Sequence, residues 1–269
     1  MSKQQAKKVT SKKQGEKPDN KGENKMWGKI FEKVITAVVM KSATEGLKQI
    51  VKSYAKVKDW WNGKSIAVIG STASGKNSFF NKLKLEEIPN QHIQTRGSEK
   101  VKTFKFEYGM PDRSKIQFRC TKSFNVGGEI DERERYWLQS CEDADVIFYL
   151  IDFGKLMSHS DDTINRISSD FEWLSTHLPY FKADSYIHVL VNKIDLLLGD
   201  EKSSKDKETI LADSKPQLEK IEEIAKKIFG SHFGRISGIN PISMKDSYLF
   251  SQFFTITLES VFNESIKKG

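Results

Sequence analysis

Two short and almost continuous apolar runs constrain the fold of this chain more than any other feature. Residues 145–151 read DVIFYLI, and residues 186–191 read YIHVLV. Strands with so few polar residues are buried on both faces, as the central strands of a parallel sheet are. Helical periodicity appears between and after these runs, so strands alternate with helices along the chain. The sequence therefore predicts an α/β fold, with a mostly parallel central sheet and helices on both faces.

Further elements are expected from periodicity and turn signals. A β-branched run over residues 65–69 ends at Gly70, and residues 101–107 and 115–120 alternate like two paired strands joined by a turn at residues 110–112. Helices are expected over residues 78–85, 132–142, 162–178, 214–228 and 247–266. Residues 199–215 are polar and charge-dense, and we expect them to form a mobile insertion.

Composition excludes several classes of protein. The 269 residues are 37% hydrophobic and 30% charged, which is typical of a globular chain and not of a disordered or fibrous one. The longest apolar run, near residues 34–40, falls short of the ~20 residues of a membrane-spanning helix. No secretory leader pattern is present, and Cys120 and Cys141 give neither a disulfide framework nor a metal spacing. We therefore expect a cytoplasmic protein.

The positive charge is concentrated at the N-terminus. Residues 1–64 carry 16 Lys against six acidic residues, a balance of +10, so the net charge of +8 leaves about −2 for the rest. Residues 1–25 lack large apolar side chains and are expected to be a disordered basic arm. Residues 26–63 are expected to be an amphipathic helical extension, and residues 64–269 the α/β domain.

The extension has a regular apolar stripe. Apolar residues recur at three- and four-residue steps as far as Trp61, lysines occupy the other faces, and Asn62-Gly63 supplies a stop signal. We expect Trp60 and Trp61 to anchor the end of the helix against the domain.

Four roles for this N-terminal region remain open. The stripe could bind a protein partner or a second copy, or the lysine-lined helix could attach the protein peripherally to an anionic membrane. The arm could bind nucleic acid through phosphate neutralisation, which is the least favoured role because no aromatic residue is interleaved among its lysines. The helix could also pack on its own domain with no outside partner.

A glycine-containing loop follows the first expected strand. Residues 70–77 read GSTASGKN, and a helix is expected directly after them. Glycines let successive backbone N–H groups surround a phosphate, and the N-terminus of the helix adds a positive dipole end. The expected nucleotide-binding residues are Gly70, Ser71, Ser74, Gly75, Lys76, Asn77 and Ser78, with Lys76 reaching the β- and γ-phosphates. Taken alone, the same residues could form an ordinary strand-to-helix turn.

A second motif follows the apolar run 186–191. Residues 192–195 read NKID, and the Asp195 carboxylate can accept hydrogen bonds from N1–H and the 2-amino group of guanine, a pattern that adenine does not offer. We expect Asn192 to tie this loop to guanine and the stem of Lys193 to lie along the ring.

A third motif, ISMK at residues 242–245, precedes the last expected helix. Here Ser243, Met244 and Lys245 could place backbone amides on the guanine oxygen.

The order of these motifs resembles that of the Ras-like superfamily of small GTPases, and within it the Arf-type branch. The resemblance covers roughly residues 64–269. Residues 124–129 (FNVGGE) resemble the Arf-type second switch, with Gly128 at the amide that meets the γ-phosphate. Residues 91–97 (QHIQTRG) resemble the first switch, with Thr95 in the position that senses Mg²⁺ and the γ-phosphate. The resemblance implies a P-loop GTPase fold that binds GTP or GDP with Mg²⁺.

Three positions depart from the family pattern. Asn77 replaces the Ser or Thr that ligates Mg²⁺, Asn125 replaces an Asp, and Glu129 replaces the Gln that orients the attacking water. Because Mg²⁺ prefers charged oxygen ligands, we expect a weakly held ion at Asn77, Thr95 and Asn125. A carboxylate at Glu129 faces a polyanion, and two like unit charges about 4 Å apart repel by ~4 kcal/mol at an effective dielectric near 20. We therefore expect intrinsic hydrolysis of GTP to be slow or absent.

The catalytic assignment leaves alternatives open. Glu129 and Thr95 are the candidate catalytic residues, and Glu129 could instead be a general base with a raised pKa. Arg96 could act as an arginine finger in cis or be an ordinary surface residue. The resemblance implies a regulatory or assembly protein that responds to GTP and GDP. The chain could also be a non-hydrolysing pseudo-GTPase adaptor that docks on a membrane or a protein complex through its N-terminal helix.

Overall fold

The computed structural model describes residues 55–84, 98–100, 104–109, 115–120, 124–126, 130–198 and 207–268. The contacts of the chain divide it between Ala43 and Thr44, and all of these residues belong to the unit Thr44–Gly269. The predicted basic arm, most of the predicted extension and both switch loops at residues 91–97 and 127–129 lie outside the described residues. Among the helices in the described part, none combines the length and apolar character that a membrane span needs.

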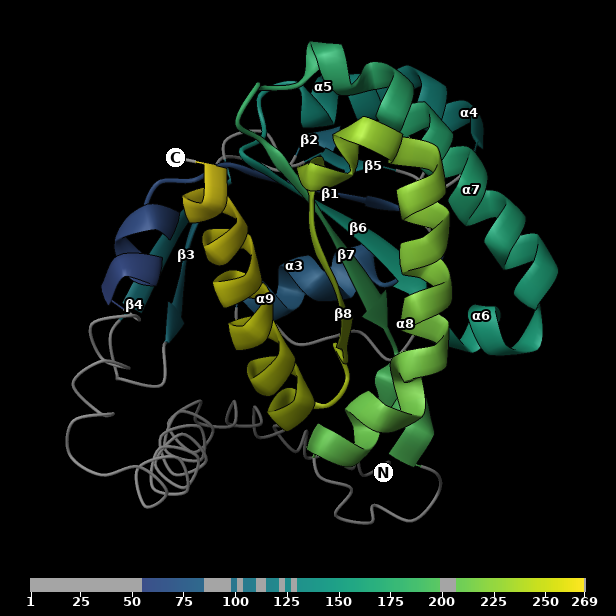
Figure 1. The fold of residues 1–269 in the computed structure, drawn as a ribbon. Coiled ribbons are helices and arrows are strands. Elements are labelled where there is room, and N and C mark those ends of the chain that lie inside the picture. Colours follow the sequence, from purple (N-terminus) through teal and green to yellow (C-terminus); the bar gives the residue numbers. More distant parts are fainter. Residues whose placement is uncertain are drawn as a thin grey trace, which may run out of the picture. The chain divides into compact units, whose positions relative to one another are not determined.

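The central sheet is parallel (Figure 1). Its four strands are, in spatial order, β1 (Ile66–Gly70), β6 (Val146–Asp152), β7 (Tyr186–Asn192) and β8 (Ile236–Ile242). Every residue of β1, β6 and β7 is buried, as the apolar runs predict. The register pairs Gly70 with Leu150 and Asp152 with Asn192, so the carboxyl ends of these strands meet at one edge.

Two antiparallel pairs complete the described strands. β3 (Phe104–Gly109) pairs with β4 (Lys115–Cys120), which confirms the expected pairing of these segments. Residues 101–103 of the expected first strand and the expected turn at residues 110–112 lie outside the described residues. β2 (Ser98–Lys100) pairs with β5 (Phe124–Val126), a pairing that the sequence did not predict.

Helices cover both faces of the sheet, so the predicted α/β fold class is confirmed. They are α3 (Lys76–Lys84), α4 (Ile130–Glu132), α5 (Leu138–Cys141), α6 (Phe153–Ser158), α7 (Ser160–His177), α8 (Lys207–Phe229) and α9 (Ser247–Lys268). A π-helical turn, η1 (Arg133–Trp137), joins α4 to α5, and short 3₁₀ turns lie at η2 (Leu178–Tyr180), η3 (Ile194–Leu198) and η4 (Gly230–Arg235). All five expected helices are present with shifted ends.

One face of the sheet is packed with aromatic rings. The ring of Phe148 in β6 lies 5.4 Å from that of Phe79 in α3 and 6.3 Å from that of Phe254 in α9, measured between centroids. The ring of Trp61 stacks on that of Phe148, with 6.4 Å between the centroids. α3, α9 and the helix at residues 55–61 therefore cover this face.

The opposite face of the sheet is covered in the same way. Tyr149 follows Phe148 in β6, and its side chain points to this face because successive side chains of a strand lie on opposite faces. The ring of Tyr149 lies 5.4 Å from Phe171 in α7 and 6.2 Å from Trp137 in η1. Phe171 in turn contacts Phe229 of α8 at 5.7 Å. α7, α8 and the helix at residues 130–141 cover this face.

The end of the N-terminal extension packs into the domain. Residues 55–61 are helical, and Trp61 is fully buried with its Nε1 donating to the carbonyl of Leu258 in α9 at 3.0 Å. Trp60 meets Trp61 edge to face at 5.0 Å, and Gly63, with φ +81°, follows the end of the helix. The expected anchoring by the tryptophan pair and the expected stop signal are both confirmed.

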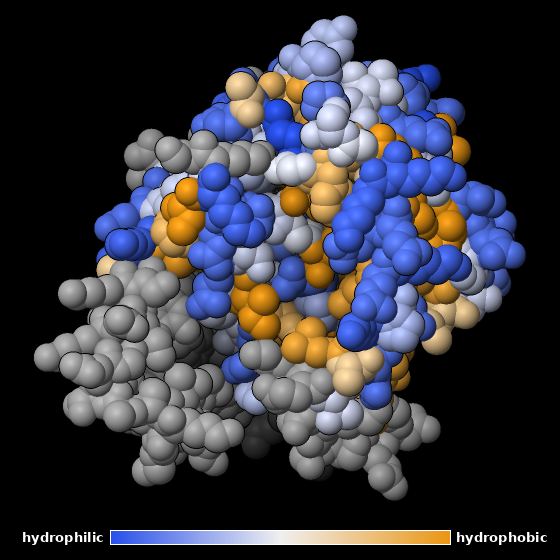
Figure 2. Space-filling model, viewed as in Figure 1, coloured by the Kyte–Doolittle hydropathy of each residue, from blue (hydrophilic) through white to orange (hydrophobic). Residues whose placement is uncertain are grey.

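Helix α8 begins inside the segment that we expected to be a mobile insertion. Its first residue is Lys207, and the side chain of Ile210 is fully buried. Packing of this buried apolar side chain stabilises a helix in an otherwise polar segment, because tertiary contacts override local helix propensity. The helix continues through Pro216, and its outward face is charged, as the hydrophilic surface over α8 in Figure 2 shows. Residues 199–206 lie outside the described residues.

Candidate functional site

Three of the motifs singled out in the sequence meet at the carboxyl edge of the sheet. The loop at residues 70–75 follows β1, the turn η3 follows β7, and residues 243–246 follow β8. Because all three strands are parallel, their following loops lie on the same side. In open α/β sheets this edge is where ligands bind.

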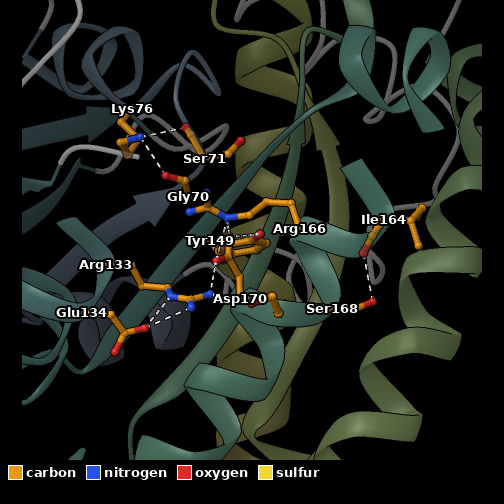
Figure 3. Close-up of polar contacts among 11 residues, drawn as sticks. Gly70, Ser71, Lys76, Arg133, Glu134, Tyr149, Ile164, Arg166, Ser168 and Asp170 are labelled. Carbon is orange, nitrogen blue, oxygen red and sulfur yellow. Dashed lines mark hydrogen bonds and ion pairs between the residues drawn. The ribbon is translucent and has the colours of Figure 1, made fainter. Parts of the chain in front are cut away.

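The loop after β1 surrounds the ammonium group of Lys76. Its Nζ donates to the carbonyl of Gly70 at 2.8 Å and to that of Ser71 at 2.9 Å, and Figure 3 shows both contacts. Gly70 has φ +139°, and a Cβ there would lie 2.3 Å from the carbonyl oxygen of Leu150. Only glycine fits so close to the neighbouring strand, so this position fixes where the loop leaves the sheet.

Two residues in the left-handed region turn the loop. Ala73 has φ +66° and Gly75 has φ +100°, and the amide of Ser74 donates to the carbonyl of Ser71 at 3.3 Å between them. A Cβ at Gly75 would lie 2.2 Å from Nδ2 of Asn192. A non-glycine residue at positive φ is strained, and such strain is concentrated at functional sites.

The side chain of Asn192 joins all three loops. Its Nδ2 donates to the carbonyl of Ser74 at 2.9 Å, and its Oδ1 accepts from the amide of Met244 at 3.1 Å. Asn192 is 2% exposed, so both ends of a buried amide are satisfied by backbone groups. The sequence predicted a tie from this residue to guanine and did not predict these ties between loops; a direct contact with the base stays a prediction.

Asp195 is held by the motif after β8. Its Oδ1 accepts from the hydroxyl of Ser243 at 2.7 Å, and that hydroxyl in turn accepts from the amide of Asp246 at 2.9 Å. Ser243 is fully buried, whereas Asp195 is partly exposed and Lys245 is exposed. The two motifs expected to recognise one base are therefore in direct contact.

Lys193 pairs with a residue that sequence reasoning missed. Its Nζ lies 2.6 Å from Oδ2 of Asp152, the last residue of β6, whose side chain is 4% exposed. Oδ1 of the same carboxylate accepts from the amide of Lys155 at 3.2 Å, and Lys155 Nζ donates to the carbonyl of Thr72 at 2.9 Å. A signal was present, since Asp152 directly follows the apolar run 145–151 and so ends at the same edge.

The candidate metal residues are only partly described. Asn77 and Ser78 lie in the first turn of α3, and both are partly exposed. Of Asn125 the structure describes only the backbone, in β5. Thr95, Gly128 and Glu129 lie outside the described residues.

The described donors do not fit a tight Mg²⁺ site. Within the part of the chain that the structure describes, no three His, Cys, Asp or Glu side chains form a metal-binding group. At position 77 the chain offers an amide oxygen in place of a hydroxyl, whereas Mg²⁺ in proteins is bound through carboxylates and phosphates.

A buried ion network lies on the α7 face of the sheet (Figure 3). Asp170 has no exposed surface and accepts from Arg133 Nη1 at 2.9 Å, from Arg166 Nε at 2.9 Å and from the hydroxyl of Tyr149 at 2.8 Å. Burial, together with the negative charge of Asp170, raises the pKa of Tyr149 well above its ordinary value. The network attaches the helix that follows the predicted second switch to α7.

Comparison with known proteins gives solved structures only. No protein-family model and no curated protein matches the chain. A GTP-binding protein from the hyperthermophilic archaeon Sulfolobus solfataricus, in complex with GDP, is 18% identical over 88% of this chain and 62% of that chain, with a TM-score of 0.42. A point variant of SsGBP is 20% identical over 84% and 65% of the two chains, with a TM-score of 0.45.

A third similar structure is the GDP-bound RocCORdC part of Roco2 from Methanosarcina barkeri. It is 20% identical over 73% of this chain and 49% of that chain, with a TM-score of 0.40. The chain spans between about half and two thirds of the length of these structures.

Proposed function

We propose that this chain is a guanine-nucleotide-binding protein of the small-GTPase type, with a regulatory or assembly role and with slow or absent intrinsic hydrolysis of GTP. One observation carries the proposal. The side-chain amide of Asn192 donates to the loop around Lys76 and accepts from the loop at residues 243–246, and Ser243 of that second loop donates to Asp195. A candidate phosphate-binding residue and a candidate base-binding residue are thereby fixed at one edge of the sheet. One small molecule with an anionic tail and a hydrogen-bonding base suits this arrangement.

Recognition of the base is assigned to Asp195. The Ser243 hydroxyl bonds Oδ1, which orients the carboxylate and leaves it partly exposed. A carboxylate only accepts hydrogen bonds, and guanine presents two donors on one edge, at N1 and the 2-amino group. Adenine presents an acceptor at N1, so the same carboxylate disfavours it.

Binding of the phosphates is assigned to the loop around Lys76 and to the N-terminus of α3. The loop carbonyls of Gly70 and Ser71 bind the ammonium group, and the backbone N–H groups at the start of α3 provide a positive dipole end. Magnesium, when bound, would neutralise phosphate charge, and we assign it weak attachment at Asn77, Thr95 and Asn125 because none of these side chains is a carboxylate.

Slow hydrolysis is inferred from Glu129 in place of a glutamine. A carboxylate beside the γ-phosphate is repelled by the negative charge of the phosphate, whereas a neutral glutamine amide can approach it and orient the attacking water. Single-turnover hydrolysis of radiolabelled GTP by the full chain tests this point. Turnover at the rates of ordinary small GTPases contradicts it.

The main experiment identifies the ligand. The full chain is purified and denatured, and the released small molecules are analysed by mass spectrometry, followed by titration with GDP, GTP, ADP and ATP. We expect guanine nucleotide in the released fraction and binding of GDP with a clear preference over ADP. A protein that carries no nucleotide and also ignores added GDP and GTP contradicts the proposal and leaves the pseudo-GTPase adaptor.

A separate part of the proposal concerns the N-terminal extension. We infer that residues before Ala55 dock a protein partner or an anionic membrane surface, with the helix at residues 55–61 as the attachment to the domain. Burial of Trp61 supports this, because the attachment is a packed side chain and not a free linker. Liposome flotation and pull-down, each with and without residues 1–54, distinguish the two partners, and loss of neither interaction on truncation contradicts the inference.

A further inference from the structure

The carboxylate of Asp152 binds two different elements at once. It ends the central strand β6, which lies between β1 and β7 in the sheet. Oδ2 pairs with Lys193 Nζ at 2.6 Å, and Oδ1 caps α6 by accepting from the amide of Lys155 at 3.2 Å. The carboxylate is nearly buried, so an oxygen left without a hydrogen-bond partner would destabilise the folded protein. Both contacts are therefore needed to stabilise the buried charge.

The first contact acts on the loop that recognises the base. Lys193 has φ +71°, a strained conformation for a residue with a side chain, and it lies between Asn192 and Ile194. Pairing with Asp152 holds Lys193 in this conformation. The turn that carries Asp195 begins directly after it, at Ile194.

The second contact acts on the loop assigned to the phosphates. Asp152 fixes the first turn of α6, and from that turn Lys155 donates to the carbonyl of Thr72 at 2.9 Å.

Three other carbonyls of the same loop also accept from side chains. Those of Gly70 and Ser71 accept from Lys76, and that of Ser74 accepts from Asn192. Four carbonyl oxygens of this loop are thus occupied by side-chain donors, which holds the loop in one conformation, and successive backbone N–H groups of such turns can bind an anion.

We propose that Asp152 is a positioning residue that couples the base loop to the phosphate loop, with Lys193 and Lys155 as its two connections. This inference rests on the proposed function of the site. Coupling makes the two loops bind the two ends of one nucleotide as a unit, because neither loop has to be ordered separately when the ligand arrives. Because the Asp152 carboxylate is nearly buried and both of its oxygens are bonded within the protein, we expect it to act on affinity and to leave the choice of base to Asp195.

The test begins with Asp152→Asn in the full chain, measured by calorimetric titration with GDP and ADP. We expect the Kd for GDP to rise about tenfold, the size of one lost charge-assisted hydrogen bond, with an unchanged ratio of GDP to ADP affinity. Asp152→Glu keeps the charge and should recover most of the affinity. A Kd for GDP equal to that of the unaltered chain overturns the inference.

Asp145→Asn is the matched control. Asp145 lies directly before β6, at its opposite end, and pairs with Lys182 at 3.0 Å. Its loss also removes hydrogen bonds from Ser65, so it costs stability at a place remote from the loops. We expect its Kd for GDP to stay within about twofold of the original. An equal loss of affinity in Asp145→Asn and Asp152→Asn shows general destabilisation and overturns the inference.

A double-mutant cycle provides a readout that a merely structural role would not change. Lys155→Met and Lys193→Met remove one connection each, and Lys155 is exposed while the side chain of Lys193 is 40% exposed, so neither substitution opens the core. Each should raise the Kd for GDP about fivefold, and the pair should raise it by clearly less than the product of the two.

Multiplicative effects of the two lysines overturn the coupling even where Asp152→Asn fails to fold. The proposed function fails separately, when the unaltered chain binds no guanine nucleotide at all.

Discussion

The base side and the metal side of the proposed site are built differently. On the base side, Asn192, Asp195 and Ser243 have the side chains that guanine recognition needs, and each is held by a described hydrogen bond. On the metal side, Asn77 offers an amide in place of a hydroxyl. In the proposed site, the residues assigned to select the ligand are thus separate from those assigned to act on it, and the proposal predicts that one set can change without the other.

The largest expected effect comes from Gly75→Ala, which disturbs both sides at once. The new Cβ would lie 2.2 Å from Asn192 Nδ2, at a φ of +100° that alanine rarely adopts. We expect the Kd for GDP to rise at least about 100-fold, equivalent to ~3 kcal/mol. Gly109→Ala is the control, because nothing lies within 4 Å of a Cβ there. Equal GDP affinities of the two variants in calorimetric titration contradict the role assigned to Gly75.

Asp195→Asn affects the base side alone. An amide presents a donor where guanine also presents one, so the preference for GDP over ADP should fall about 50-fold, as expected for a buried polar mismatch. Titration with both nucleotides measures the ratio, and the affinity for ADP serves as the internal control because it should change little. An unchanged ratio shows that another residue recognises the base.

Asn77→Ser affects the metal side alone. A hydroxyl oxygen at the start of α3 should strengthen Mg²⁺ attachment. The gain in GDP affinity between EDTA and Mg²⁺ should therefore be about tenfold larger in the variant than in the unaltered chain. Affinities without Mg²⁺ should be equal in both proteins. If the two proteins respond alike to Mg²⁺, the amide at position 77 is not what weakens the ion.

The smallest expected effect on the comparison comes from pH, through a buried residue of the sheet that belongs to neither side. Burial lowers the pKa of His188 in β7 from 6.5 to about 3, so between these values only the unfolded chain takes up the proton. Stability should therefore fall as pH drops below 6.5, by at most about 1.4 kcal/mol per unit from this group. The ratio of GDP to ADP affinity should not change.

Denaturant unfolding between pH 5 and 7 measures this slope, and His188→Gln should reduce it. An equal slope in both proteins assigns the acid sensitivity to other groups. A ratio of GDP to ADP affinity that shifts with pH shows that a titrating group lies at the base side itself.

Sequence patterns predicted the centre of the fold because local chemistry sets it. A run such as residues 145–151 has one stable environment, a strand buried on both faces. The loop around Lys76 was equally predictable, since positive φ at Gly70 and Gly75 needs glycine. The three motif loops meet because parallel strands end at one edge.

The features that sequence patterns missed depend on contacts between distant segments. The role of Asp152 follows from its register beside Asn192, and no local pattern encodes that pairing. The sequence pattern predicts no strand over β8, because Gly238 and Pro241 interrupt the alternation of its residues. The start of α8 depends on Ile210, a single apolar residue whose side chain is buried in the core.

The buried indole of Trp61 has a practical consequence for handling this protein. Its ring stacks on Phe148, four residues before Asp152 in the same strand, and its N–H is bonded to the C-terminal helix. Removing Trp61 together with the residues before it would leave a hole of tryptophan size in the domain, at a cost of about 3–5 kcal/mol. A force applied to the chain before Trp61 would act on both β6 and α9 through the contacts of this one side chain.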